Sequence, residues 1–208
     1  MKDLPKKIAV LMGGPKIGTD EQPRMQQPMV TKPPRQGSTV GVHIVKNAQE
    51  IEPAIAGSGK YDRELLIEKF VSGRELTIGI LGDQALPILE IIPKGGFHNF
   101  TNKYPFLNPQ AGGGAEHVRP AQIDEKKTAE VQQLALRAFR AVGGRDYGRV
   151  DVILSDSGEL FVLEVNTIPG ITEASLLREA AAVAGIGYSD LFARIIALSR
   201  ARAEGSPR

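Results

Sequence analysis

The chain has 208 residues, and its 26 Lys and Arg nearly balance its 24 Asp and Glu, so the net charge of +2 does not favour nucleic acid or membrane surfaces as partners. The absence of cysteine excludes disulfides, thiol catalysis and thiolate metal sites. No apolar run approaches the roughly 20 residues of a membrane span, and the apolar residues 8–12 are too few for a secretory leader. We therefore expect a cytoplasmic protein of one or two domains.

Short apolar runs alternate with loops in the first part of the chain. Residues 8–12 predict a buried strand that ends in a glycine turn, whereas the proline-rich stretch 15–36 has no core-facing pattern. Asn47 can cap a short helix that ends near Ala56. Further strands are expected at 30–32, 41–45, 64–70, 75–81 and 85–92.

The second part of the chain combines a hairpin with helices. A long glycine-rich loop at 93–122 carries Lys103 and Tyr104 and is typical of an active-site lid. Hairpin strands followed by helices favour an α+β fold over a doubly wound sheet. The elements predicted after the loop are a helix at 124–142, hairpin strands at 148–154 and 159–165, and two helices with Ser175 and Asp190 as N-caps.

Acidic residues gather in the predicted hairpin. If residues 157–158 form its loop, Asp156 pairs with Glu159, and counting back places Asp151 opposite Glu164. The period of two along a strand adds polar side chains to that face and puts apolar ones on the other. The polar residues are Arg149 and Asn166, and the apolar ones are Val150, Val152, Leu163 and Val165.

Two facing carboxylates destabilise a sheet unless a positive charge neutralises them. Arg149 could do so, and a hard cation such as Mg²⁺ is the alternative, because Asp151, Glu164 and Asn166 offer only oxygen donors. Mg²⁺ usually completes its shell with water and substrate phosphates, which points to a nucleotide. Both interpretations stay open on spacing alone. A zinc site is not expected, since the histidines at 43, 98 and 117 lack ligand spacing and are interpreted as surface or loop residues.

Three further stretches offer contacts to a nucleotide or an anion, each with an ordinary alternative. Lys32 precedes a Gly-Ser-Thr loop at 37–39 whose amides could cradle phosphates, or which could be a plain turn. A strand that stops at 68–71 would leave backbone groups free to contact an adenine edge, with Glu75 near the ribose, or would be a charged connection. Ser175 could build an anion site at a helix N-terminus or only cap the helix.

From residue 30 to about 200 the chain resembles the D-alanine–D-alanine ligases of the ATP-grasp superfamily. The shared motifs occur in the family's order and with similar spacing. They are Lys32 with GSTVG (37–41), IEKFVSGREL (67–76), PKGGF and NKY in the glycine-rich loop, GRVDV (148–152) and LEVNTIPGIT with SL (163–176). The opening KIAVLMGGP (7–15) also resembles the start of the family's N-terminal domain.

The resemblance implies an ATP-grasp fold, with two α+β subdomains and a remnant of an N-terminal α/β domain. The implied ranges are 1–15 for the start of the N-terminal domain, 16–74 for a partial small subdomain and 75–208 for the C-terminal subdomain with the metal and substrate site. Family members commonly run to about 300 residues, well above the size expected of one domain. We expect that the sequence joins segments of a longer chain, and a truncated chain is the alternative.

The resemblance also implies roles for single residues. Asp151, Glu164 and Asn166 match the ligands of two Mg²⁺ ions, for which Mn²⁺ can substitute, at the phosphates of the co-substrate ATP. The catalytic positions match Arg149 at the reacting carboxyl and phosphate, Gly170 at the oxyanion, and Ser38 with Tyr104, which close loops over the substrate. The nucleotide positions match Lys32 and Lys103 at the phosphates, Glu68, Lys69 and Val71 at adenine, and Glu75 at the ribose. Ser175 and Leu176 match the residues that receive the carboxylate of the second D-alanine.

The implied activity is ATP-dependent formation of D-alanyl-D-alanine through D-alanyl phosphate, for peptidoglycan precursors, by an enzyme that is a homodimer. Tyr104 favours dipeptide formation over an ester product. The alternatives are a ligase that takes D-lactate or D-serine as its second substrate, or a nucleotide-binding truncation without ligase activity. Three residues depart from the family pattern outside the metal site, and they are His98, Asn99 and Arg119.

Overall fold

The computed structural model describes residues 7–11, 28–37, 40–93 and 115–205, which divide into two compact units. The first unit contains the described residues up to Val71 together with Pro93, and the second contains Ser72–Ile92 and 115–205. Each unit combines helix with a mainly antiparallel sheet, which agrees with the α+β class expected from the sequence. The domain ranges given above stay a prediction.

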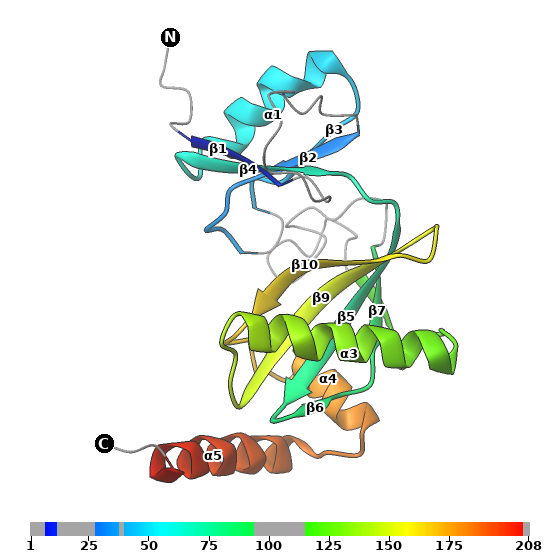
Figure 1. Ribbon diagram of the computed structural model, residues 1–208, viewed down its shortest axis with the longest axis vertical. Helices are drawn as coiled ribbons and strands as arrows, with labels where there is room; N and C mark the ends of the chain where they lie inside the picture. The colour runs from blue at the N-terminus through cyan, green and yellow to red at the C-terminus, as the bar shows by residue number, and fades with distance from the viewer. Residues whose placement is uncertain (1–6, 12–27, 38–39, 94–114, 206–208) are drawn as a thin grey trace. The chain divides into compact units, whose positions relative to one another are not determined.

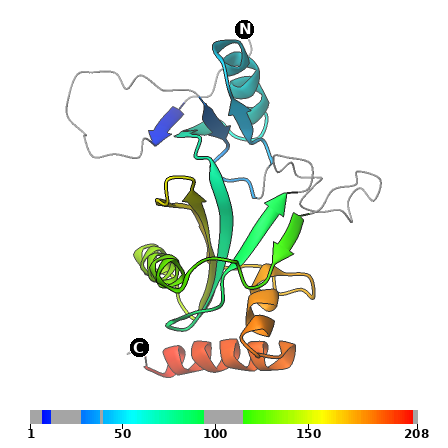
Figure 2. The same ribbon diagram turned by 90° about the vertical axis from the view of Figure 1, so that its right-hand side faces the viewer.

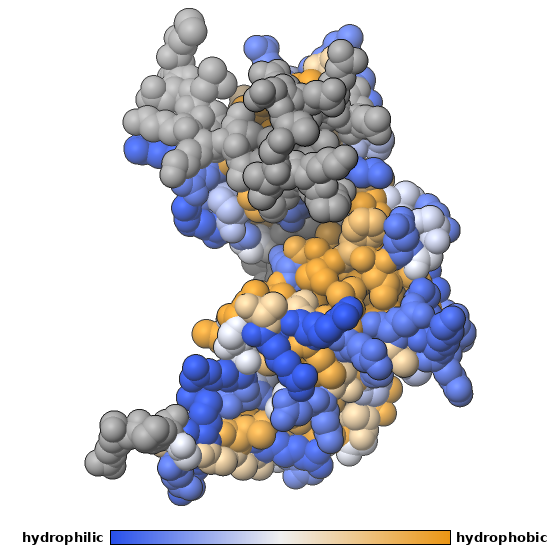
Figure 3. Space-filling view, viewed as in Figure 1, coloured by the Kyte–Doolittle hydropathy of each residue, from blue (hydrophilic) through white to orange (hydrophobic). Residues whose placement is uncertain are grey.

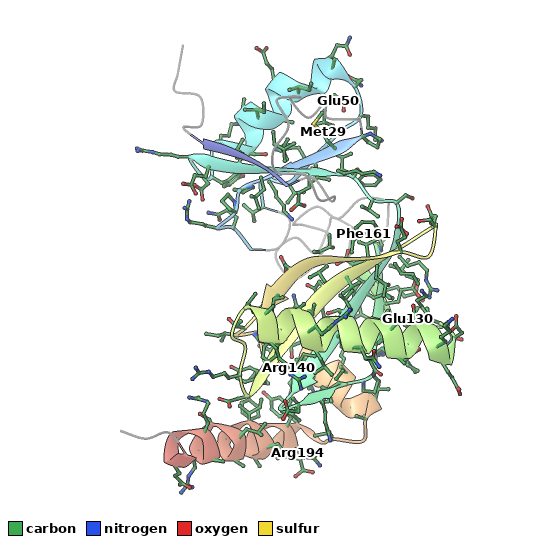
Figure 4. The ribbon with its side chains drawn as sticks, viewed as in Figure 1. Met29, Glu50, Glu130, Arg140, Phe161 and Arg194 are labelled. Carbon is green, nitrogen blue, oxygen red and sulfur yellow. The ribbon has the colours of Figure 1, made fainter. Side chains whose placement is uncertain are left out.

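The first unit is built on a four-stranded sheet covered on one face by a helix (Figure 1). The strand order is β1-β4-β2-β3, and only the pair β1 and β4 is parallel. Figure 4 shows Met29 between the sheet and the helix, where it packs with Val45, Ala54 and Ile67. The elements are β1 Lys7–Leu11, β2 Met29–Lys32, β3 His43–Val45, η1 Ala48–Glu50, α1 Ile51–Ser58 and β4 Glu64–Lys69.

The second unit is built on a six-stranded sheet of order β10-β9-β5-β7-β8, in which β6 also pairs with β5. Its two central strands pair along nine residues each, from Gly73 opposite Ser155 to Leu81 opposite Tyr147. The strand predicted at 85–92 is interrupted, and the loop predicted at 93–122 contains a strand. The strands are β5 Gly73–Leu81, β6 Gln84–Ala85, β7 Leu89–Pro93, β8 Ala115–Val118, β9 Tyr147–Ser155 and β10 Leu160–Asn166.

Helices cover both faces of this larger sheet (Figure 2). On one face lies α3 (Glu125–Ala141), which begins as predicted after Asp124, whose side chain accepts from the Lys127 amide at 2.8 Å. Its residues Val131, Ala135 and Phe139 pack on alternate residues of the central strands. Those strand residues are Leu76, Ile78, Ile80, Val150 and Val152, and the last two lie in the apolar layer as expected.

The opposite face carries α4 (Leu176–Val183) and α5 (Tyr188–Gly205). Ser175 caps α4 as predicted, but Asp190 does not cap α5, because that helix already begins at Tyr188 and the Leu191 amide bonds to the Gly187 carbonyl at 2.9 Å. Within the described ranges no single helix is long and apolar enough to cross a membrane. By length and composition alone, α4 and α5 pass that test only together, across a bend of 103°.

Candidate active site

The strands β9 and β10 bring the expected polar side chains onto one face of the larger sheet. Asp151 lies opposite Glu164, and Arg149 lies opposite Asn166, as the hairpin analysis predicted. Facing side chains on antiparallel strands have Cβ atoms about 4.5–5.5 Å apart, so these four can act on one another. The predicted pairing of the two carboxylates is therefore confirmed.

The turn between the two strands differs from the prediction. Ser155, not Asp156, faces Glu159, because the Ser155 amide donates to the Glu159 carbonyl at 2.9 Å. Gly158 donates in turn to the Ser155 carbonyl at 2.9 Å and has a φ of +83°, a conformation that favours glycine. The expected two-residue loop and the pairing of Asp156 with Glu159 are wrong, because the turn contains three residues.

A β-bulge in β10 compensates for the longer turn. The register shifts between Val162 and Glu164, which leaves Leu163 as the extra residue. Without this bulge the three-residue turn would place Leu163 opposite Asp151, and the two carboxylates would not face each other. Leu163 is 37% exposed, so the expectation that it points into the apolar layer is wrong. Figure 3 shows apolar side chains gathered on the surface over β10.

The Asp151 carboxylate is buried and held by three donors. The Thr77 hydroxyl donates to its Oδ1 at 2.5 Å, while Arg149 donates from Nε to Oδ1 at 2.9 Å and from Nη2 to Oδ2 at 2.8 Å. Such a two-pronged contact fixes both the guanidinium and the carboxylate in one orientation. Burial of the pair is tolerated because the charges are matched and hydrogen-bonded.

Arg149 also faces the second carboxylate. Its Nη2 lies 3.7 Å from Oε1 of Glu164, whose side chain is about half exposed. The predicted pairing of Arg149 with the two acids is thus confirmed for both partners. Because the Glu164 carboxylate stays about half exposed beside Arg149, arginine pairing and cation binding are not mutually exclusive here.

The turn after β10 begins with Asn166, whose side-chain Oδ1 accepts from the Ile168 amide at 3.1 Å. An amide oxygen has two lone pairs, so this bond leaves capacity for a second contact. Further along the turn, Gly170 has no atom within 4 Å of where a Cβ would stand, so a ligand has room to approach its backbone. The role of its amide at an oxyanion stays a prediction.

The donor set on this sheet face fits a hard cation. Asp151, Glu164 and Asn166 contribute two carboxylates and one amide oxygen, the oxygen ligands that such a cation prefers. Among the residues that the structure describes, no group of three or more His, Cys, Asp or Glu side chains forms a metal site by itself. A metal ion here would therefore need the Asn166 amide and ligands from water or phosphate.

The helix α4 places the predicted substrate residues beside this cluster. Ser175 accepts from the Arg178 amide at 3.4 Å, a long N-cap contact, and Leu176 is the first residue of the helix. The next residue, Leu177, packs on β5 at Gly79, which is the strand neighbour of Arg149. The sheet thus positions the start of α4 close to the arginine, within one unit.

Glu75 lies on the same sheet face as Thr77, two residues earlier along β5, where it is opposite Ile91 on one side and Ile153 on the other. Thr77 is a further residue of this site that the sequence did not indicate. Its contact with Asp151 joins residues 74 positions apart, so no local pattern indicates it.

The predicted nucleotide residues of the first unit lie on β2 and β4. Lys32 Nζ is 2.8 Å from Glu68 Oε2, so the structure joins a predicted phosphate ligand to a predicted adenine-pocket residue. Lys69 pairs with Met29, and Val71 follows the end of β4. The sequence predicted that backbone groups at 68–71 would be free to contact adenine, but the Phe70 amide already donates to the Pro28 carbonyl at 3.1 Å.

Three of the predicted site residues, Ser38, Lys103 and Tyr104, lie outside the described residues, as do the family departures His98 and Asn99. Two of the histidines are not the surface or loop residues that the sequence suggested. His43 is half-buried in β3, and His117 in β8 binds Glu179 of α4 through Nδ1 at 2.9 Å.

Comparisons with known proteins agree with this geometry. The family described as "D-ala D-ala ligase C-terminus" matches residues 13–197. A D-alanine–D-alanine ligase of Methylacidiphilum infernorum is 41% identical over 186 residues, which are 89% of this chain and 59% of that protein.

Two solved structures are similar as well. The D-alanine–D-alanine ligase of Bacillus anthracis complexed with ATP has a TM-score of 0.67 and 31% identity, covering 86% of this chain and 54% of the other. VanG, the D-Ala:D-Ser ligase of Enterococcus faecalis, has a TM-score of 0.74 and 30% identity, covering 84% and 50%. The chain thus spans about half the length of the proteins it matches.

Proposed function

This chain belongs to the D-Ala D-Ala ligase family, through its C-terminal domain, and on that premise we propose that it is the ATP-grasp part of an enzyme that joins two D-alanines. The reaction forms D-alanyl-D-alanine and converts ATP to ADP and phosphate. The observation that carries the proposal is the joint placement of Arg149, Asp151, Glu164 and Asn166 on one sheet face. We also propose that this enzyme is a cytoplasmic homodimer, as expected in the sequence analysis.

In the first step, a carboxylate oxygen of the first D-alanine attacks the γ-phosphorus of ATP, and the bond to ADP breaks. Arg149 would face the negative oxygens of both reacting groups. Its guanidinium is mostly buried and already fixed by Asp151, so it needs no reorganisation when charge develops. This preorganisation is the main contribution of the sheet to the step.

In the second step, the amine of the second D-alanine attacks the acyl phosphate carbon, and the tetrahedral intermediate expels phosphate. The Gly170 amide would receive the oxyanion, and the open space around that residue supports the assignment. Ser175 and Leu176 at the start of α4 would bind the carboxylate of this D-alanine, because the first amides of a helix attract anions.

The group that neutralises the phosphates would be Mg²⁺, held by Asp151, Glu164 and Asn166, or Mn²⁺ in its place. When bound, such an ion supplies positive charge to phosphoryl oxygens. The ATP contacts of the first unit would be Lys32 at the phosphates and Glu68, Lys69 and Val71 at adenine. Glu75 of the second unit would contact the ribose, and Lys103, Ser38 and Tyr104 retain the roles that the resemblance implies.

The test is D-alanine-dependent phosphate release from ATP, with the dipeptide identified by mass spectrometry. Arg149→Gln should lower kcat by about 10²–10³, the usual loss when a preorganised donor to developing charge is removed. Arg140→Gln is the matched control, because Arg140 lies on α3 and pairs at the surface with Asp83. If the unmodified protein binds ATP but forms no dipeptide, the chain is a nucleotide-binding unit only and the proposal is wrong.

A second candidate is a ligase that takes D-serine as its second substrate, which the similarity to VanG favours. Competition between equal concentrations of D-alanine and D-serine, with both dipeptides quantified, separates the two. Predominant D-alanyl-D-serine would replace the leading proposal, whereas predominant D-alanyl-D-alanine would support it.

A further inference from the structure

A histidine and an arginine side chain meet at one carboxylate beside the start of α4. His117 Nδ1 lies 2.9 Å from Glu179 Oε2, and Arg119 Nη1 lies 3.6 Å from the same oxygen. The Glu179 side chain is 13% exposed, so water screens this oxygen only in part. The two basic residues come from β8 and the residue that follows it, so the contacts tie the edge of the sheet to the helix.

The position of Glu179 makes its charge relevant to an anion at the helix start. Glu179 lies in the first turn of α4, and its amide donates to the carbonyl of Ser175 at 3.0 Å. A carboxylate in the first turn stabilises the helix itself but repels a second anion bound at the same end. A positive charge close to Glu179 offsets this repulsion, and the helix N-terminus then stays attractive to a substrate carboxylate.

We propose that Arg119 compensates the charge of Glu179, that His117 holds the Glu179 carboxylate, and that the two together set the affinity of the α4 start for the carboxylate of the second substrate. Arg119 supplies the permanent positive charge, and His117 holds the Glu179 carboxylate in place. None of the three touches the reacting atoms, so they act as positioning residues. The inference rests on the proposed function, because it assigns that carboxylate to Ser175 and Leu176.

The decisive comparison is Arg119→Gln against the double variant Arg119→Gln/Glu179→Gln. The single variant leaves Glu179 uncompensated and should raise KM for the second D-alanine about two- to fivefold, as expected for a partly exposed charge near a helix terminus. The double variant removes the repelling charge as well and should return this KM to within about twofold of the unmodified protein. KM for ATP and kcat should stay unchanged in both.

Salt gives a second readout that a purely structural role would not move. The difference between Arg119→Gln and the unmodified protein should shrink when the ionic strength rises to about 1 M, where the Debye length falls to about 3 Å. Equal KM values for Arg119→Gln and the unmodified protein would overturn the inference. So would a double variant without recovery, or a parallel rise of KM for ATP.

Binding of D-alanyl-D-alanine, measured by calorimetry, separates this inference from the proposed function. If the protein makes no dipeptide but binds it two- to fivefold more weakly as Arg119→Gln, with recovery in the double variant, the proposed function fails and the inference stands. If turnover is normal and dipeptide affinity is the same in all three proteins, the inference fails and the function stands. Absence of both turnover and dipeptide binding would overturn both.

Discussion

Gly79→Ala tests whether α4 rests directly on the sheet. A Cβ at position 79 would lie 2.9 Å from Cδ1 of Leu177 and 2.9 Å from Cδ1 of Leu86, with the Ala180 Cβ at 3.5 Å. Distances below 3 Å require atoms to move, so the added methyl group must displace the two leucine side chains or lift the helix. Glycine is therefore needed here for close approach.

The expected cost follows from two opposing terms. Overpacking of a filled core costs about 1–3 kcal/mol, and the clashing atoms are the ends of flexible leucine side chains, which favours the lower half of that range. Replacing a strand glycine by alanine returns about 0.5–1 kcal/mol of chain entropy. The net loss should be about 0–1.5 kcal/mol, which corresponds to a fall in Tm of up to about 6 °C for a protein of this size.

Thermal and urea denaturation of the variant measure this loss, and Gly187→Ala is the control. A Cβ at position 187 has only one neighbour, at 3.9 Å, and lies just before α5, so the control should be neutral or slightly stabilised. KM for the second D-alanine should rise in Gly79→Ala if the helix start moves with α4. A Gly79→Ala protein as stable as the Gly187→Ala control would refute the close-packing argument.

Three further predictions concern single side chains. Thr77→Val leaves the buried carboxylate of Asp151 without one donor and should cost about 1–3 kcal/mol in urea denaturation, whereas Thr77→Ser should cost clearly less. Hydrogen bonds from the Glu64 amide and then from Arg35 lower the pKa of Asp62. The ionised Asp62 therefore stabilises the fold above about pH 4, and this contribution is lost as the pH falls further. Asp62→Asn should make Tm fall less steeply at acid pH, and an unchanged dependence of Tm on pH would contradict this. Glu164→Gln should raise the Mg²⁺ concentration for half-maximal stabilisation by ATP about tenfold or more, and an unchanged requirement would argue against Glu164 as a ligand.

The hairpin shows how far local patterns reach. Strand alternation alone placed Asp151 opposite Glu164, and the structure agrees, although the turn was predicted one residue too short. The bulge at Leu163 corrects the register, and bulges leave no clear mark in an apolar run, because each residue of that run suits either face. The sequence therefore predicted the correct pair of residues, but neither the third residue of the turn nor the bulge.

Contacts between distant segments could not be predicted from the sequence. Thr77 and Asp151 are 74 residues apart, and His117 and Glu179 are 62 apart, so neither contact has a spacing that local periodicity can recognise. Gly79 lies inside the predicted strand 75–81, but nothing in that stretch shows why glycine is needed there. Glycine is needed there because α4, from a distant part of the chain, packs directly on this residue.

The sequence by itself determined the chemistry of the candidate site, because carboxylates, an amide and an arginine on alternate residues of two strands can present only oxygen ligands and one cation. Only the tertiary structure determined which other residues surround these side chains. It buries Asp151 and completes its contacts with Thr77, and it seats α4 on the sheet with Glu179 held from β8. These contacts arise from the packing of segments far apart in the chain, so only the folded structure contains them.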